Sequence, residues 1–189
     1  MKKPICAVVG VGPGNGAALA RRFAAGGYAV ALMARGSTLS GTLAAELDDA
    51  RAYECDAADA TSVKDTFARV RAELGEVDVL VYNAGSGSWG SIEEITPEAF
   101  EAAWRVNALG SLLVARQVIP AMKRAGAGSI IFIGATASCG GCRGRRPSRP
   151  PRPRSVSSRN PWRARSGRPA FTWPSWFWMG WSTSRRPAR

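Results

Sequence analysis

The sequence predicts an α/β fold with a doubly wound parallel sheet in residues 1–140. Short apolar runs rich in β-branched residues alternate there with segments of helical periodicity, and Gly or Pro marks several of the junctions. Strands joined by helices form right-handed crossovers, which bury a parallel sheet between two helical layers. The pattern stops after about residue 140, so we expect the sheet to be truncated after its fifth strand.

Five strands and four helices are expected in strict alternation. The strands are residues Ile5–Val9, Tyr28–Met33, Ala52–Cys55, Val77–Tyr82 and Ser129–Ile133. The helices are residues Gly14–Ala25, Ser40–Asp49, Thr61–Leu74 and a long helix from Thr96 through Met122. Thr61 and Thr96 are the expected amino-terminal caps of the last two, and Pro97 suits a first helical turn.

Residues 141–189 have a different character and form a tail. They carry 13 Arg, no acidic residue, eight of the 12 Pro and five of the seven Trp. Residues 1–140 hold all 14 acidic residues and the other 13 basic ones, so the net charge of +12 comes from the tail. A chain segment rich in Arg and Pro cannot bury a core, and we expect it to be disordered. Neither a nucleic-acid nor a membrane partner is expected.

A glycine-rich loop lies between the first strand and the first helix. Gly10, Gly14 and Gly16 allow the backbone to turn tightly and to approach a pyrophosphate. The helix that follows offers free N–H groups and a partial positive charge. A plain tight turn is the alternative interpretation, but the position between strand and helix favours phosphate binding.

Four further motifs follow in order, each at the end of a strand or inside the long helix. They are Cys55-Asp56, Asn83-Ala84-Gly85, Asn107-Ala-Leu-Gly110 and Gly134-Ala-Thr-Ala-Ser138. With the glycines, these motifs make residues 4–140 resemble the short-chain dehydrogenase/reductase family. The resemblance implies a Rossmann-like fold, hydride transfer between NAD(P) and a small carbonyl or alcohol substrate, and a homo-oligomer.

The resemblance also implies a role for each motif. The glycines, Asp56 beside the adenine, and Asn83, Ala84 and Gly85 would bind the cofactor. Asn107 would hold a proton-relay water and Ser138 would orient the substrate, with Thr136 as the alternative. Each of these residues also suits an ordinary turn, except that Asn is unusual inside a helix. Trp104 is expected to pack rather than to contact a ligand.

Arg35, at the end of the second strand, favours NADP as the cofactor, with NAD possible. An acid at that position binds the ribose hydroxyls of NAD, whereas an Arg accommodates a 2′-phosphate. No acidic residue lies nearby in the sequence. The alternative is an ordinary solvated Arg.

The family's catalytic Tyr-x-x-x-Lys is missing. The last Tyr is Tyr82, the last Lys is Lys123, and there is no His. Arg stays protonated and cannot serve as the acid or base. We therefore expect an oxidoreductase-family chain without turnover. The alternative is a non-catalytic nucleotide-binding chain with a basic interaction tail, and truncation at Ser138 would distinguish the two.

The composition of the tail suggests a frameshift after about residue 141. Joining the third base of each codon to the first two of the next turns Trp176–Trp181 into Val-Leu-Asp-Gly and one apolar residue, a strand-like run. The missing helix would leave Leu112, Val114 and Ile119 exposed and the family's dimer interface damaged.

Four cysteines and no signal peptide indicate a reducing, cytoplasmic setting. Cys139 and Cys142 have CxxC spacing, but no second Cys pair or His accompanies them. We therefore expect neither a metal nor a redox site.

Overall fold

The computed structural model of the chain describes residues 3–87, 90–134 and 180–182. The chain separates into two compact units, Met1–Ile133 with Trp178–Arg189, and Gly134–Phe177. All helices and strands described below belong to the first unit.

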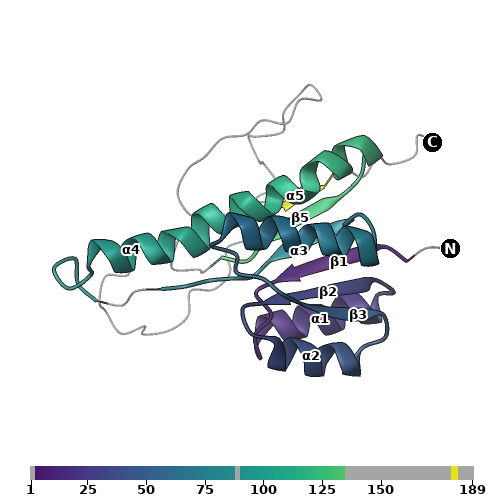
Figure 1. Cartoon of the computed structure of the whole chain (residues 1–189), viewed down its shortest axis with the longest axis horizontal. Coiled ribbons are helices and arrows are strands. Elements are labelled where there is room, and N and C mark those ends of the chain that lie inside the picture. The colour runs from purple at the N-terminus through teal and green to yellow at the C-terminus, as the bar shows by residue number, and fades with distance from the viewer. Residues whose placement is uncertain (1–2, 88–89, 135–179, 183–189) are drawn as a thin grey trace, which may run out of the picture. The chain divides into compact units, whose positions relative to one another are not determined.

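A six-stranded sheet lies at the centre of this unit (Figure 1). Its strands are β1 (Ile5–Val9), β2 (Ala29–Ala34), β3 (Ala50–Glu54), β4 (Val79–Tyr82), β5 (Ser129–Phe132) and β6 (Gly180–Ser182). They lie in the order β3-β2-β1-β4-β5-β6. The first five are parallel, as the sequence predicts, whereas β6 pairs antiparallel with β5 and was not expected.

The order of the strands reverses between β1 and β4. The chain steps outward from β1 to β3 and then returns to place β4 on the other side of β1. Val9 at the end of β1 is therefore in register with both Met33 of β2 and Tyr82 of β4. In open α/β sheets the crevice beyond such a reversal is where ligands bind.

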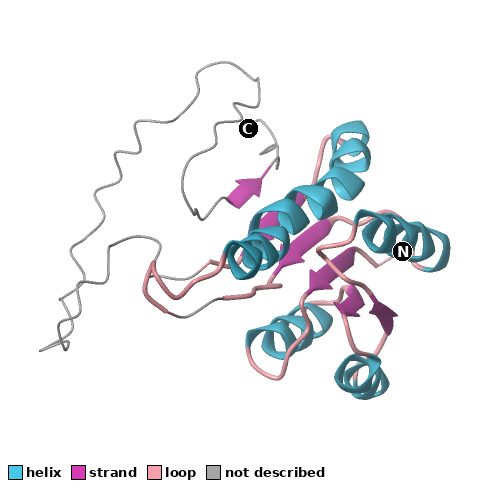
Figure 2. Cartoon of the chain, turned by 60° about the vertical axis from the view of Figure 1, so that its left-hand side comes forward, coloured by secondary structure: helices cyan, strands magenta, loops and turns pink. Residues whose placement is uncertain are grey.

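Helices cover both faces of the sheet (Figures 1 and 2). The helices of the described residues are α1 (Asn15–Ala25), α2 (Ser37–Glu46), α3 (Ala60–Glu73), α4 (Pro97–Trp104) and α5 (Gly110–Ala125). Of these, α4 projects beyond the sheet (Figure 1). A π-helical turn, η1 (Arg105–Leu109), joins α4 to α5. Figure 1 shows α1 and α2 on one face and α3 and α5 on the other.

Each face has its own apolar core. Ala17, Ala20 and Leu43 of α1 and α2 pack against Val8 and Leu32 on one side. The other core is larger and joins α3 and α5 to the sheet; its members include Val63, Phe67, Val70, Val114, Val118 and Leu80. Burial of an aliphatic or aromatic side chain contributes about 1.5–3 kcal/mol, so both clusters stabilise the packing of the helices on the sheet.

The expectation that Val114, on the apolar face of α5, is exposed is wrong. Its side chain is fully buried in the core that α5 shares with α3. Ile119 is half-buried and packs against the same cluster, and Leu112 is also half-buried. The long helix turns Val114 toward the sheet, so β4 and α3 cover it without any later helix.

The structure corrects three local expectations. The cap of α3 is Asp59 rather than Thr61, because the Asp59 carboxylate accepts hydrogen bonds from the amides of Thr61 (2.6 Å) and Ser62 (2.9 Å). The long helix is not continuous, since η1 interrupts it. Trp104 does not pack in the core; it is 44% exposed, on a helix that buries none of its residues. The cap expected at Thr96 is confirmed.

Candidate functional site

A pocket of about 440 Å³ opens beyond the carboxyl ends of β1, β2, β3 and β4. Its lining comes from the residues at which these four strands end and from the π-helical turn. The lining residues are Val9, Gly10, Val11, Gly12, Ala34, Arg35, Gly36, Cys55, Asp56, Ala57, Asn83, Ala84, Gly85 and Val106. Residues far apart in sequence thus meet at the reversal between β1 and β4.

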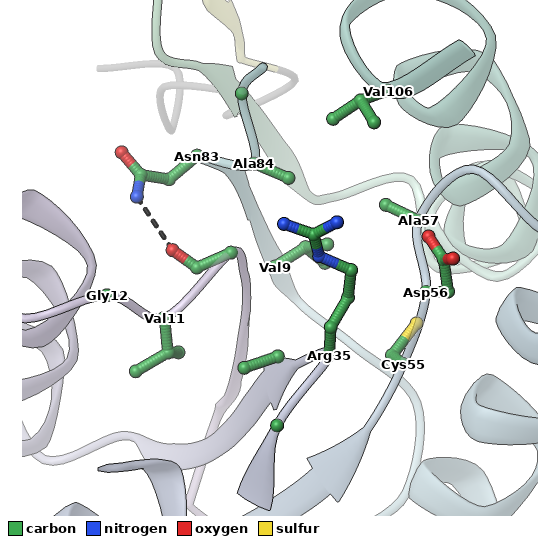
Figure 3. A pocket seen from close by; sticks show the side chains of 14 residues that line it. Val9, Val11, Gly12, Arg35, Cys55, Asp56, Ala57, Asn83, Ala84 and Val106 are labelled. Carbon is green, nitrogen blue, oxygen red and sulfur yellow. Dashed lines mark hydrogen bonds between the residues drawn. The ribbon is translucent and has the colours of Figure 1, made fainter. Parts of the chain in front are cut away.

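Gly10 and Asn83 join the two strands that flank the reversal. The Asn83 side-chain amide donates a hydrogen bond of 2.8 Å to the Gly10 carbonyl (Figure 3). Gly10 has a φ of +90°, and a Cβ there would lie 2.7 Å from the carbonyl carbon of Asn83. Only glycine combines that backbone conformation with such a close approach. The glycine loop therefore lies directly against the end of β4.

The remaining glycines of the loop have two different roles. A Cβ on Gly16 would lie 2.6 Å from the Gly10 carbonyl oxygen and 2.8 Å from Val11 Cα, so Gly16 lets α1 start close to the loop. Gly12 and Gly14 face open space, with nothing within 4 Å of an added Cβ. No described side chain caps the amino end of α1. Its N–H groups and its dipole therefore favour an anion on the open side.

Two charged side chains line the pocket. Arg35 extends from the end of β2 into the space between Ala84 and Asp56 (Figure 3). Asp56 follows β3, and its Oδ1 accepts a hydrogen bond of 2.9 Å from the Ala58 amide. The carboxylate thus fixes its own turn, as one sequence interpretation had it, while still facing the pocket. The charged side chains of the described lining are therefore one cation, Arg35, and one carboxylate, Asp56.

Cys55 contributes a neutral thiol to the wall. It is only 3% exposed, and burial raises its pKa above the usual range. A thiol that remains protonated is a poor nucleophile. Its contribution to the site is shape rather than reactivity.

Asn107 lies in η1, immediately after the pocket residue Val106. Its Oδ1 accepts a hydrogen bond of 3.1 Å from the Ser86 amide, and its Nδ2 donates one of 2.6 Å to the Ser86 carbonyl. Ser86 directly follows the Asn83-Ala84-Gly85 segment. The side chain therefore fastens the loop after β4 to the helix.

Tyr82 is not a substitute for the missing acid. Its ring is buried at 3% exposure, and its hydroxyl donates a hydrogen bond to the Val106 carbonyl. Burial raises its pKa, which disfavours the phenolate further. A buried hydroxyl engaged with the backbone cannot exchange protons with a substrate.

The structure brings together most of the residues that the sequence singles out. Gly10, Arg35, Asp56, Asn83, Ala84 and Gly85 all line the pocket. Gly14 and Gly16 lie at the start of α1, beside the loop rather than in the lining. Ser138, Thr136 and the CxxC pair lie outside the described residues.

Sequence reasoning missed Gly12, Gly36, Val106 and several apolar wall residues. Most could have been found from topology, because residues after parallel strands meet at one edge of the sheet. The sequence does not indicate that Val106 lines the pocket, because Val106 lies in the π-helical turn and does not follow a strand. Among the described residues, no helix has both the length and the apolar character that crossing a bilayer requires.

Residues 4–145 match the family model described as short chain dehydrogenase. Curated relatives include the 3-oxoacyl-[acyl-carrier-protein] reductase MabA of Mycobacterium tuberculosis, 35% identical over 71% of this chain and 51% of its own length. The D-threitol dehydrogenase of Mycolicibacterium smegmatis is 31% identical over 71% of this chain and 53% of its own. The chain thus spans about half the length of the curated relatives it matches.

Solved structures show the same similarity. An actinorhodin polyketide ketoreductase with NADPH superposes with a TM-score of 0.71 at 31% identity, covering 74% of this chain and 56% of the other. A gluconate 5-dehydrogenase from Burkholderia cenocepacia in complex with NADP and tartrate gives 0.66 at 30% identity, covering 73% and 56%.

Proposed function

Because this chain belongs to the short chain dehydrogenase family, we propose that it binds NADP(H), with the adenosine half in the pocket beyond β1–β4. One observation carries the proposal. The glycine loop, Arg35, Asp56 and the Asn83–Gly85 segment converge on a single pocket at the reversal of strand order.

The residues present fit such a cofactor. The open side of Gly12 and Gly14, next to the uncapped amino end of α1, suits a pyrophosphate. Asp56 stands where its carboxylate can accept a hydrogen bond from a base or sugar.

The choice of NADP over NAD depends on Arg35. It is the positively charged side chain of the lining, and the first turn of α2, which follows it directly, contains no acidic residue. A 2′-phosphate would therefore meet a guanidinium and a helix amino end rather than a carboxylate. Two similar proteins were solved with NADPH or NADP, which supports the same choice.

When bound, the cofactor supplies the hydride for oxidation or reduction at a small carbonyl or alcohol. The chain's own residues bind and orient it, but the sequence offers no Tyr after Tyr82 and no Lys after Lys123. We propose that the chain as written binds NADP(H) without turnover. We also propose a cytoplasmic setting, from its cysteines, and a homo-oligomer by family.

Calorimetric titration with NADPH and with NADH tests the binding proposal. Circular dichroism first establishes that the protein is folded. We expect saturable heat with NADPH and a weaker response to NADH. Folded protein that gives no heat with either nucleotide would refute the cofactor site, and tighter binding of NADH would refute the role of Arg35.

A further inference from the structure

The helical segment that follows the β4 loop contains an irregular turn, and Val106 of that turn lines the pocket. Between α4 and α5, residues 105–109 adopt a π-helical turn. Such turns are rare inside helices and are frequently found at functional sites. Tyr82 reaches this turn from the end of β4, and its hydroxyl donates to the Val106 carbonyl.

The hydroxyl fits there because Gly110 has no side chain. A Cβ on Gly110 would collide with Tyr82 Oη and would lie 2.7 Å from the Ala57 carbonyl oxygen. Gly110 itself is buried. Strand β4 and the helix therefore approach each other closely enough for one hydroxyl to reach the backbone of the turn.

The turn held by Tyr82 carries two groups that act on the pocket. Val106 is part of the lining. Asn107, the next residue, makes both of its hydrogen bonds to the backbone of Ser86. If the π-helical turn shifted by one residue along the helix, the Asn107 amide would lose its two hydrogen bonds to Ser86. The loop that follows Asn83–Gly85 would then be released.

We propose that Tyr82 is a positioning residue for the cofactor site: through the Val106 carbonyl, its hydroxyl sets the turn from which Asn107 holds the loop after β4. The identity of the ligand rests on the proposed function, but the positioning itself does not. Tyr82 acts through Asn107 and touches no ligand.

A tyrosine that only fills the core would behave differently. The Tyr82 ring packs against Phe132, with centroids 6.2 Å apart and planes at 53°. A phenylalanine at position 82 would keep that contact and lose only the hydroxyl. Tyr82→Phe therefore separates packing from positioning.

Tyr53 provides a matched control. It is also buried and, like Tyr82, lies outside the pocket lining, but its hydroxyl donates to Glu73 Oε2 at 3.0 Å rather than to the π-helical turn. Tyr53→Phe removes the same atoms and one hydrogen bond from the far edge strand. Any general effect of losing a buried hydroxyl should appear in both variants.

The first measurement is amide hydrogen exchange of Ser86 in the full chain without nucleotide, by NMR. We expect about three- to tenfold faster exchange in Tyr82→Phe, in keeping with the loss of one hydrogen bond, and no change in Tyr53→Phe. If Tyr82→Phe does not fold, the hydroxyl proton of Tyr82 is followed by NMR in the wild-type chain, where its hydrogen bond to the Val106 carbonyl should slow its exchange with water. A hydroxyl proton that exchanges freely would overturn the proposal. Unchanged Ser86 exchange in a folded variant would overturn the proposal.

The second measurement is NADPH affinity in a double-mutant cycle with Asn107→Ala. We expect Tyr82→Phe to raise Kd about three- to tenfold in the wild-type background and to have no further effect once Asn107 is removed. Equal effects in both backgrounds would overturn the action through Asn107. If wild type bound neither nucleotide, the proposed function would fail while Ser86 exchange still decided the role of Tyr82.

Discussion

Asn107 and Ser86 hold each other by two hydrogen bonds across 21 positions of sequence, at 3.1 Å through Oδ1 and 2.6 Å through Nδ2. A side-chain amide has two N–H protons and two lone pairs, so one of each is used on the backbone. The family resemblance implies that Asn107 holds a proton-relay water, but in this structure its side chain binds the backbone of the loop after β4. A water bound to this side chain would have to use the second N–H proton or the second lone pair.

Arg35→Asp should weaken NADPH and leave NADH unchanged or improved. A charge-assisted hydrogen bond contributes about 1.5–3 kcal/mol, so we expect NADPH affinity to fall roughly ten- to a hundredfold. Calorimetry with both nucleotides measures the ratio. Arg116→Asp, an exposed position on α5 outside the pocket, is the control for charge reversal in general. An unchanged ratio of affinities would make Arg35 an ordinary surface residue.

Gly14→Val and Gly16→Val should fail for different reasons. The side chain at position 14 enters open space, so the fold should tolerate it while pyrophosphate binding is blocked. At position 16 it meets the Gly10 carbonyl and the Val11 backbone, and overpacking of this kind costs about 1–3 kcal/mol. Thermal melting and NADPH titration distinguish the two. A Gly14→Val protein that binds NADPH normally would exclude a phosphate from that side of the loop.

Alkaline pH should destabilise the fold partly through Tyr53. Burial, together with its hydrogen bond to Glu73, raises the pKa of Tyr53 to about 12. Because the folded-state pKa is raised, the stabilisation is fully present below the ordinary value of about 10 and is lost as pH rises toward 12. Between pH 8 and pH 12, the free energy of unfolding, measured with denaturant, should fall less steeply with pH in Tyr53→Phe than in wild type. Parallel curves for wild type and variant would contradict this assignment.

The chain as written should not catalyse hydride transfer. Proton transfer by a positioned acid or base contributes about 10²–10⁴-fold. In the described lining, the Asp56 carboxylate is bound to the Ala58 amide in its own turn, and Cys55 is a buried, protonated thiol, so neither is placed to replace the family's Tyr. A panel of ketones and alcohols with NADP(H), followed at the nicotinamide absorbance, should show no rate above buffer. Turnover that survives purification and is lost in Ser138→Ala would reveal a proton donor outside the described residues.

Much of the fold was predictable because its signals are local. The run Ile5–Val9 is apolar and bounded by Pro4 and Gly10, and β1 has these limits. The sequence also places Gly10, Arg35 and Asn83 after strands, and topology then brings them together. Where a residue follows a parallel strand, its sequence position already determines which edge of the sheet it occupies.

The features that were missed depend on contacts that sequence does not display. The run from Pro97 to Met122 reads as one helix in the sequence. The π-helical turn within it coincides with the approach of Tyr82 over Gly110, a contact between residues far apart in the sequence. Asp59 and Thr61 are both capping residue types, and only the backbone conformation shows that Asp59, the stronger of the two types, holds the cap position. Val114 was expected to be exposed because the family's next helix is missing from the sequence. In the structure it is buried in the cluster that contains Val63, Phe67 and Val70 of α3.

The hydrogen bond from Asn83 to Gly10 has a kinetic consequence. Because the glycine loop is already fastened to the end of β4, its conformational entropy is lost during folding and not when a ligand arrives. A nucleotide then meets a preformed surface, so rapid mixing should show a single association phase whose rate rises linearly with nucleotide concentration. Releasing the loop with Asn83→Ala should add a slower, concentration-independent step.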